Sequence, residues 1–191
     1  MFEVFRQYLL SKAAFTPEEL AQIEEKSVVK KLRRKQYLLQ EGHLWKHYAF
    51  VCKGCLRTYQ VDDKGVEHIF RFSPEHWWAG DRESLINGTP STSNIDALED
   101  SVLLLFTRDD FDALRRSIPA MEEVVNTLLS RSYMAANKRI QSAISRSTEE
   151  RYKEFIEQYP DLLNRIPLHM IASYLGVTAE TLSRIRARNV S

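Results

Sequence analysis

Short apolar segments separated by turn residues occupy the chain from about residue 35 to residue 107. They are rich in Val, Ile, Leu, Tyr and Phe and are shorter than buried helices, so they indicate β-strands. Between two of them, residues 62–65 (Asp-Asp-Lys-Gly) suit a tight hairpin connection. Many short strands joined by turns predict an antiparallel barrel or sandwich, and we expect a β-roll. The expected strands are residues 37–39, 48–51, 56–61, 66–72 and 102–107.

Beyond Pro119 the apolar positions follow a helical period. Between Met121 and Ile144 they recur every three or four residues, which predicts one amphipathic helix of about seven turns. Its apolar stripe has two candidate partners, namely the β domain of the same chain and the same helix of a second subunit. We favour the second subunit, because a long helix leaving a compact domain otherwise keeps apolar surface in water.

Two capping boxes mark further helix starts. Thr16 is followed three residues later by Glu19, with Pro17 at the first helical position, and Ser147 is followed by Glu150. We expect a short helix after Thr16 and a second one that runs to about residue 159, where Pro160 stops it.

The composition is that of an ordinary folded, water-soluble protein. Of the 191 residues, 43% are hydrophobic and 28% are charged. The longest strictly apolar run, residues 102–106, is far below the roughly 20 residues that cross a bilayer, so we expect no membrane partner. The start of the chain lacks the pattern of a secretory signal, and the cysteines, Cys52 and Cys55, form no disulfide framework. We therefore expect a cytoplasmic location.

The segment from Ile166 to Arg186 has the pattern helix, sharp turn, helix. Gly176 supplies the left-handed backbone that ends the first helix, and Thr178 is placed to cap the second. Leu182 provides part of the inward face of the second helix. The inward face also includes Ile171, Tyr174, Leu175 and Ile185.

The opposite face of the second helix is polar and basic. Although the net charge of the chain is only +1, the residues from 164 onward contain four arginines against one glutamate. In the major groove arginine bonds guanine in bidentate fashion and glutamate accepts from cytosine, while threonines near the positive end of the helix dipole suit phosphates. A solvated helical hairpin is the plain alternative. The predicted DNA contacts are Thr178, Glu180, Thr181, Ser183, Arg184, Arg186 and Arg188.

Nearly the whole chain resembles the Crp/Fnr family of bacterial regulators. The resemblance lies in Glu41-Gly42, in residues 50–57, in Gly80-Asp81 and above all in residues 178–186. It implies a homodimeric, sequence-specific DNA-binding transcription regulator and no enzymatic activity. The implied fold is α+β, with an N-terminal antiparallel β-roll of the cyclic-nucleotide-binding type (residues 1–117), a long dimerisation helix (118–145) and a C-terminal helix-turn-helix domain (146–191).

The resemblance also implies where a small effector would bind the β-roll. In the members that bind cyclic nucleotides, a Gly-Glu pair holds the ribose and an Arg-Ser pair holds the phosphate. Here Gly80-Asp81 shortens the first pair, and Ser91-Thr92 replaces the second. Without its arginine a buried phosphate loses charge-assisted hydrogen bonds of about 1.5–3 kcal/mol each. We expect no tight binding of cyclic AMP and assign no cofactor, while a different small effector, or none, stays open.

Two other functions stay open at this stage. Cys52 and Cys55 have the spacing of a redox pair, which makes a thiol-based redox sensor one alternative. A zinc site is not expected, because no second Cys/His pair stands at a matching interval. The other alternative is a binding module whose helical end contacts a protein instead of DNA. No nucleophile elbow or phosphate-binding glycine loop indicates a catalytic residue.

Overall fold

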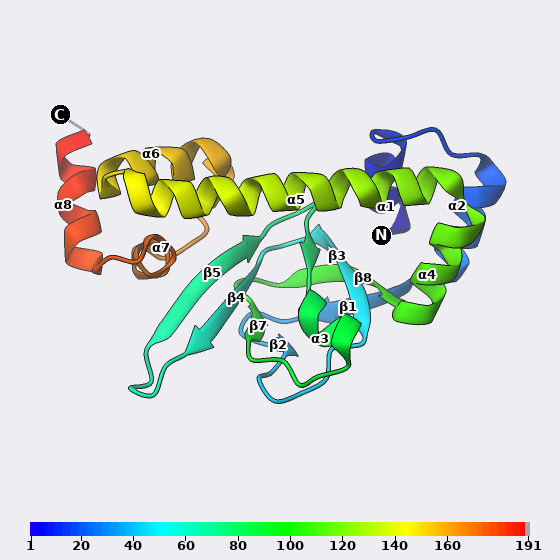
Figure 1. Ribbon diagram of the computed structural model, residues 1–191, viewed down its shortest axis with the longest axis horizontal. Coiled ribbons are helices and arrows are strands. Elements are labelled where there is room, and N and C mark those ends of the chain that lie inside the picture. The colour runs from blue at the N-terminus through cyan, green and yellow to red at the C-terminus, as the bar shows by residue number, and fades with distance from the viewer. Residues whose placement is uncertain (190–191) are drawn as a thin grey trace. The chain divides into compact units, whose positions relative to one another are not determined.

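The structure, a computed structural model, describes residues 1–189 and has the α+β architecture expected from the sequence (Figure 1). Residues 190–191, the last two of the expected C-terminal domain, lie outside the described residues. The strands are β1 (Val28–Leu32), β2 (Tyr37–Leu39), β3 (His47–Lys53), β4 (Leu56–Val61), β5 (Glu67–Ser73), β6 (Trp78–Ala79), β7 (Asn94–Ala97) and β8 (Ser101–Thr107). The helices are α1 (Phe2–Leu10), α2 (Pro17–Glu25), α3 (Arg82–Asn87), α4 (Arg108–Ser117), α5 (Pro119–Ser145), α6 (Thr148–Gln158), the 3-10 turn η1 (Pro160–Leu162), α7 (Leu168–Leu175) and α8 (Ala179–Asn189).

The strands of residues 1–189 form two four-stranded sheets, in the orders β1-β8-β3-β6 and β2-β7-β4-β5. Strand β8 pairs antiparallel with β1 on one side and with β3 on the other. Each of the five expected strands is present, and β2 and β4 have the expected bounds. The tight connection between β4 and β5 is also confirmed, since the Asp62 N–H donates to the Val66 carbonyl at 3.0 Å and Gly65 has a φ of +79°.

The expected helices are confirmed as well. The Thr16 and Ser147 capping boxes open α2 and α6, and the periodic segment after Pro119 is the 27-residue helix α5. Within the described residues no helix is both long enough and apolar enough to span a membrane.

The chain forms two compact units. The first contains Met1–Thr58 and Phe72–Ser130, and the second contains Tyr59–Arg71 together with the described residues from Arg131 onward. The β4–β5 hairpin is therefore grouped with the C-terminal helices, although its two strands belong to a sheet of the N-terminal half. The division of the chain into a β-roll, a dimerisation helix and a DNA-binding domain, with boundaries at residues 117 and 145, stays a prediction.

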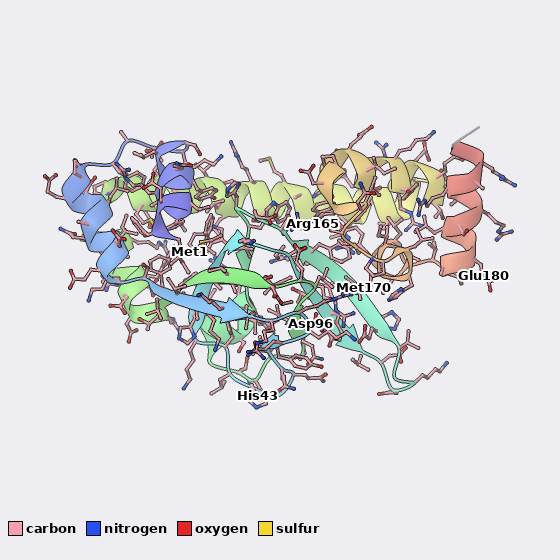
Figure 2. The ribbon with its side chains drawn as sticks, turned by 180° about the vertical axis from the view of Figure 1, so that it is seen from behind. Met1, His43, Asp96, Arg165, Met170 and Glu180 are labelled. Carbon is pink, nitrogen blue, oxygen red and sulfur yellow. The ribbon has the colours of Figure 1, made fainter. Side chains whose placement is uncertain are left out.

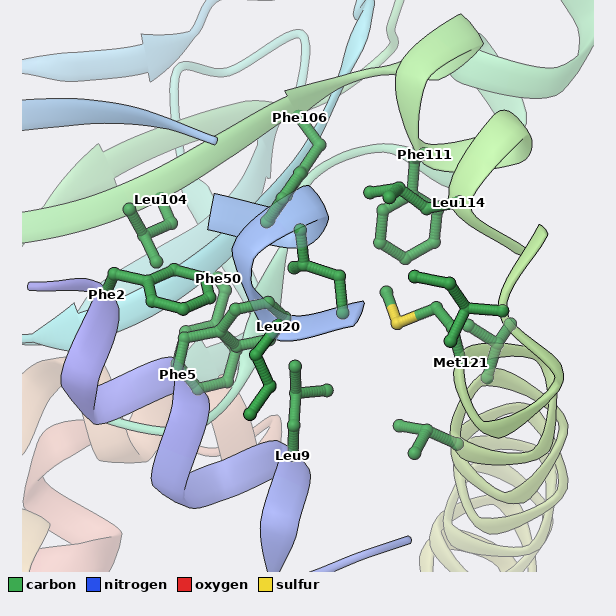
Figure 3. Close-up of a cluster of buried hydrophobic side chains, with 14 of the residues drawn as sticks. Phe2, Phe5, Leu9, Leu20, Phe50, Leu104, Phe106, Phe111, Leu114 and Met121 are labelled. Atoms are coloured by element: carbon green, nitrogen blue, oxygen red, sulfur yellow. The ribbon is translucent and has the colours of Figure 1, made fainter. Parts of the chain in front are cut away.

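The core of the first unit is built around aromatic rings (Figure 3). Helix α1 buries Phe2, Phe5 and Leu9 on one face, and the Phe5 ring lies 4.7 Å from that of Phe50 between ring centroids. Phe5 and Phe50 also make edge-on contacts with Trp78, which packs against this core. Such offset and edge-on arrangements are the favourable ones for aromatic pairs, so they make this core tight as well as apolar.

A buried ion pair joins two neighbouring strands of the first unit. The Arg57 guanidinium on β4 donates to both carboxylate oxygens of Asp96 on β7, with Nε–Oδ1 and Nη2–Oδ2 distances of 2.9 Å. The two side chains are only 9% and 8% exposed. An ion pair removed from water is stable only when both charged groups form well-directed hydrogen bonds. The two parallel N–H···O bonds between the guanidinium and the carboxylate meet this condition.

We expect replacement of Asp96 by alanine to lower the free energy of unfolding by about 3–5 kcal/mol, because Arg57 would lose its buried counter-ion. Urea unfolding monitored by tryptophan fluorescence measures this. Asp63, exposed at the tip of the hairpin, is the control, and its replacement by alanine should change the free energy by less than about 0.5 kcal/mol. Equal small losses in the two variants would contradict the expectation.

Candidate DNA-binding interface

The turn between α7 and α8 has the conformation that the sequence predicts. Gly176 ends α7 with φ +67° and ψ +37°, in the left-handed region that favours glycine. The Val177 N–H reaches back to the Ala172 carbonyl at 3.0 Å, which closes the end of the helix. Thr178 then caps α8, since its Oγ1 accepts a hydrogen bond of 3.2 Å from the Thr181 N–H. Helices α7 and α8, joined by this short, hydrogen-bonded turn, form a helix-turn-helix.

The inward faces of both helices are apolar, as expected. Ile171, Ala172 and Leu175 of α7 are buried, and Leu182 of α8 is fully buried. Tyr174 is half-buried, and its ring packs against the rings of the α6 residue Phe155 and of Tyr159. Burial raises the pKa of Tyr159 far above its ordinary value, so this side chain stays neutral. The helix-turn-helix thus rests on an aromatic support.

The exposed side of α8 carries Glu180 (Figure 2) and other predicted DNA contacts. Glu180, Arg184 and Arg188 are exposed and succeed one another at intervals of four residues, so in a continuous helix they form one row. Ser183 is exposed beside this row, while the exposed Arg186 lies on the flank of the helix. The sequence left open whether Arg186 or Arg188 shares the outer face, and the regular winding of α8 up to Asn189 favours Arg188.

The two threonines lie at the N-terminal end of the same helix. Thr178 is exposed and Thr181 is half-buried, with 3.0 Å between their hydroxyl oxygens. The Arg184 guanidinium donates to the Thr181 hydroxyl at 3.4 Å. The seven predicted contacts are therefore gathered on α8 and its capping residue, with three arginines against one glutamate.

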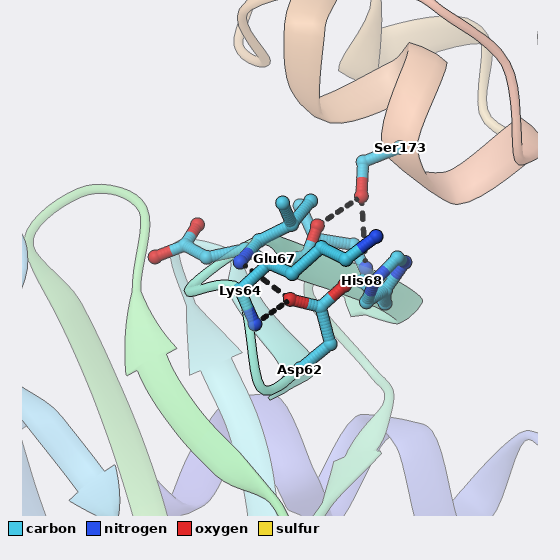
Figure 4. A network of polar contacts seen from close by, with 7 residues as sticks. Asp62, Lys64, Glu67, His68 and Ser173 are labelled. Carbon is cyan, nitrogen blue, oxygen red and sulfur yellow. Dashed lines mark hydrogen bonds and ion pairs between the residues drawn. The ribbon is translucent and has the colours of Figure 1, made fainter.

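Two residues that the sequence analysis did not select hold α7 to its neighbours in the second unit. The Ser173 hydroxyl accepts from the Ile69 N–H at 3.0 Å and donates to the Glu67 carbonyl at 2.8 Å, both on strand β5 (Figure 4). The Arg139 guanidinium on α5 donates to the Phe70 and Tyr174 carbonyls and lies 4.1 Å from the centre of the Tyr174 ring. No local pattern marks these side chains, because their partners are distant in sequence.

The hairpin that receives Ser173 is itself well ordered by Asp62 (Figure 4). One carboxylate oxygen accepts from the Lys64 and Val66 N–H groups at 2.9 Å each, and the other lies 2.9 Å from Nε2 of His68. The hydrogen bond with His68, followed by that from Val66, lowers the pKa of Asp62 below its ordinary value. The turn is thereby fixed by one ionised side chain.

The residues expected to bind an effector, Gly80, Asp81, Ser91 and Thr92, lie in the first unit, and a hydrogen bond joins two of them, Asp81 and Ser91. Asp81 caps α3 by accepting from the Glu83 and Ser84 N–H groups at 2.9 and 3.1 Å, and it accepts from the Ser91 hydroxyl at 2.7 Å. Ser91 is buried, whereas Thr92 is exposed. Gly80 lies so close to the indole of Trp45 that an added Cβ would stand 2.5 Å from its Nε1. The structure thus brings Asp81 and Ser91 together but places no arginine among the residues bonded to them.

The two thiols are buried and form no disulfide. Burial raises the pKa of Cys52 to about 11, so this group is almost wholly protonated at neutral pH. Because the thiolate is the reactive form, the geometry argues against the redox alternative for Cys52. Among residues 1–189 no group of three or more His, Cys, Asp or Glu side chains is arranged to hold a metal ion.

The chain is similar in sequence to a known domain family and to two known bacterial regulators. A model of the cyclic nucleotide-binding domain matches residues 29–117. The fumarate and nitrate reduction regulatory protein of Vibrio cholerae is 25% identical in an alignment of 184 residues that covers 90% of this chain and 71% of that protein once gaps are left out. Electron transport regulator A of Shewanella oneidensis is 26% identical in an alignment of 187 residues that covers 89% of this chain and 72% of the relative on the same basis. Both relatives are named as regulators.

The fold has close counterparts among solved structures. FixK2 from Bradyrhizobium japonicum superposes with a TM-score of 0.73 at 17% identity, over 85% of this chain and 83% of FixK2. The likeness thus extends over most of both chains.

Proposed function

We propose that the chain is a regulator of the Crp/Fnr type, and that it regulates transcription by binding duplex DNA as a homodimer. The observation that carries the proposal is the outward row of Glu180, Arg184 and Arg188 on a capped helix with a buried inner face. A helix of this kind enters the major groove, where base edges distinguish all four base pairs.

The side chains of α8 divide between two tasks. Arg184 and Glu180 are the base-reading residues in this proposal, because their long, exposed side chains lie in the N-terminal half of α8, the part of a recognition helix that contacts base edges. Thr178, Thr181 and Ser183 contact phosphates near the positive end of the helix dipole, and Arg186 and Arg188 add charge toward the other end. Phosphate contacts position the helix, and base contacts give it sequence preference.

The partner subunit in this proposal is a second copy, bound through the exposed stripe of α5. The apolar side chains of the second half of this helix stand in water, with Tyr133 70%, Ile140 58% and Ile144 82% exposed. Their spacing of seven and then four residues is that of a helix–helix seam, with Asn137 between them. Two copies joined here would present two α8 helices to one duplex, with half-sites about 34 Å apart on the same side of B-DNA.

For the β-roll we propose that any small effector it binds is not cyclic AMP. The Ser91 hydroxyl already donates to Asp81, and the carboxylate of Asp81 already takes the first N–H groups of α3. A cyclic phosphate at this place would meet a carboxylate instead of an arginine, and like charges in a partly buried site are strongly unfavourable.

We expect the protein to bind a duplex selected from random DNA with an affinity that falls steeply as salt rises, because phosphate neutralisation releases counterions. Arg184→Ala should weaken binding to the selected site by about 1–3 kcal/mol and relax the preference at one base pair. Electrophoretic shift across a salt series measures both. Arg6→Ala on α1 makes the same charge change and should leave affinity unaltered. No duplex binding by the wild type would support the protein-binding alternative.

We expect the wild-type protein to sediment at twice the mass of the 22.3 kDa chain. The double variant Ile140→Glu, Ile144→Glu should sediment as a monomer, because the seam would have to bury carboxylates without partners. Leu10→Glu on α1, a position 45% exposed, serves as the control and should stay dimeric. A dimeric double variant would place the interface elsewhere on the molecule.

We expect calorimetric titration with cyclic AMP to give no saturable heat in the micromolar range, since no guanidinium joins Asp81 and Ser91 where the phosphate would lie. A saturable signal that Ser91→Ala abolishes would show instead that the nucleotide binds beside Asp81 and Ser91.

A further inference from the structure

The edge of strand β5 receives a side chain of the helix-turn-helix in place of another strand. In the described part of the chain β5 is the last strand of its sheet, so the backbone groups on its outer side need partners from elsewhere. The Ser173 hydroxyl binds two of them, the Ile69 N–H and the Glu67 carbonyl. One oxygen thus accepts and donates as the backbone of a paired strand would, and it ties α7 to the hairpin.

Arg139 makes a second tie that involves three elements. From α5 its guanidinium donates to the Phe70 carbonyl on β5 and, at 3.2 Å, to the Tyr174 carbonyl in the last turn of α7. The Tyr174 carbonyl lies in the last turn of α7, where the helix has no further turn to supply an N–H donor. The guanidinium also lies over the Tyr174 ring, 4.1 Å from its centre. A planar, five-donor group suits this combination in a way that a lysine does not.

We propose that Ser173 and Arg139 are positioning residues that set the angle between α8 and the exposed face of α5. Neither fills the apolar core; each instead joins α7, which carries α8 across the short turn at Gly176, to a neighbouring element. The angle matters because that face of α5 is the proposed dimer seam, and the angle decides where each recognition helix meets the duplex. The inference rests on the proposed function, since it concerns how two α8 helices are spaced on DNA.

The first measurement needs no DNA. Amide hydrogen exchange of Ile69 should accelerate roughly two- to tenfold in Ser173→Ala, because its N–H loses one hydrogen bond. Ser11→Ala is the matched control, since that hydroxyl bonds only the Tyr8 carbonyl of its own helix end. Unchanged exchange at Ile69 would overturn the contact itself, whatever the protein binds.

The second measurement uses the palindrome that the wild type selects from random DNA, and versions of it with one base pair added to or removed from its centre. Wild type and Ser11→Ala should lose affinity sharply when the spacing changes. Ser173→Ala and Arg139→Lys should lose at least threefold less, because a looser α7 tolerates more than one spacing, and Arg139→Lys keeps the charge that governs salt dependence.

A merely structural role predicts a different result. A variant that is only less stable would bind every spacing more weakly by the same factor, and that outcome would overturn the positioning role. If the wild type binds no duplex, the proposed function fails and the positioning role with it, while the exchange at Ile69 still reports on the contact.

Discussion

Helix α8 has to keep one face free for a partner and still be held rigidly by the other. Leu182 is its fully buried apolar side chain, and Ile185 beside it is half-buried. Because these two side chains make only a narrow apolar contact, the N-terminal end of α8 must also be held in place. The left-handed turn at Gly176 and the cap at Thr178 hold it. The orientation of the basic face therefore depends on how α7 is held, and α7 rests on aromatic rings and on polar ties to α5 and β5.

The two units are stabilised in different ways. In the first, α1 and the sheet bury a cluster of aromatic rings, and the one buried guanidinium–carboxylate pair described above is bonded on both charges. In the second, the rings of Phe155, Tyr159 and Tyr174 are supplemented by polar groups that join separate elements, as Ser142 does when it donates to Glu154. Contacts of this kind have strict geometry and modest energy, which suits a part of the protein whose orientation carries the function.

Features with a local cause could be predicted from the sequence. The capping boxes at Thr16 and Ser147 and the glycine turn at residue 176 each depend on a few neighbouring residues, and all are present. Strand β1 was missed because its burial does not alternate: of its five residues only Leu32 is buried. Helix α1 was also missed, although Phe2, Phe5 and Leu9 have helical spacing. The predicted DNA contacts are gathered on one helix, but Ser173 and Arg139 were beyond prediction, since a polar residue on a helix normally faces water and their partners lie 104 and 69 residues away.

The long separation between Ser173 and the hairpin has a consequence for how the protein is made. The hairpin leaves the ribosome about a hundred residues before α7 does, so during synthesis the edge of β5 waits for the hydroxyl that will bind it. Contacts between such distant residues form late, because the intervening chain must first be ordered. The first helix of the helix-turn-helix thus also completes a sheet edge begun in the first half of the polypeptide, and a nascent chain halted before α7 would carry that edge open.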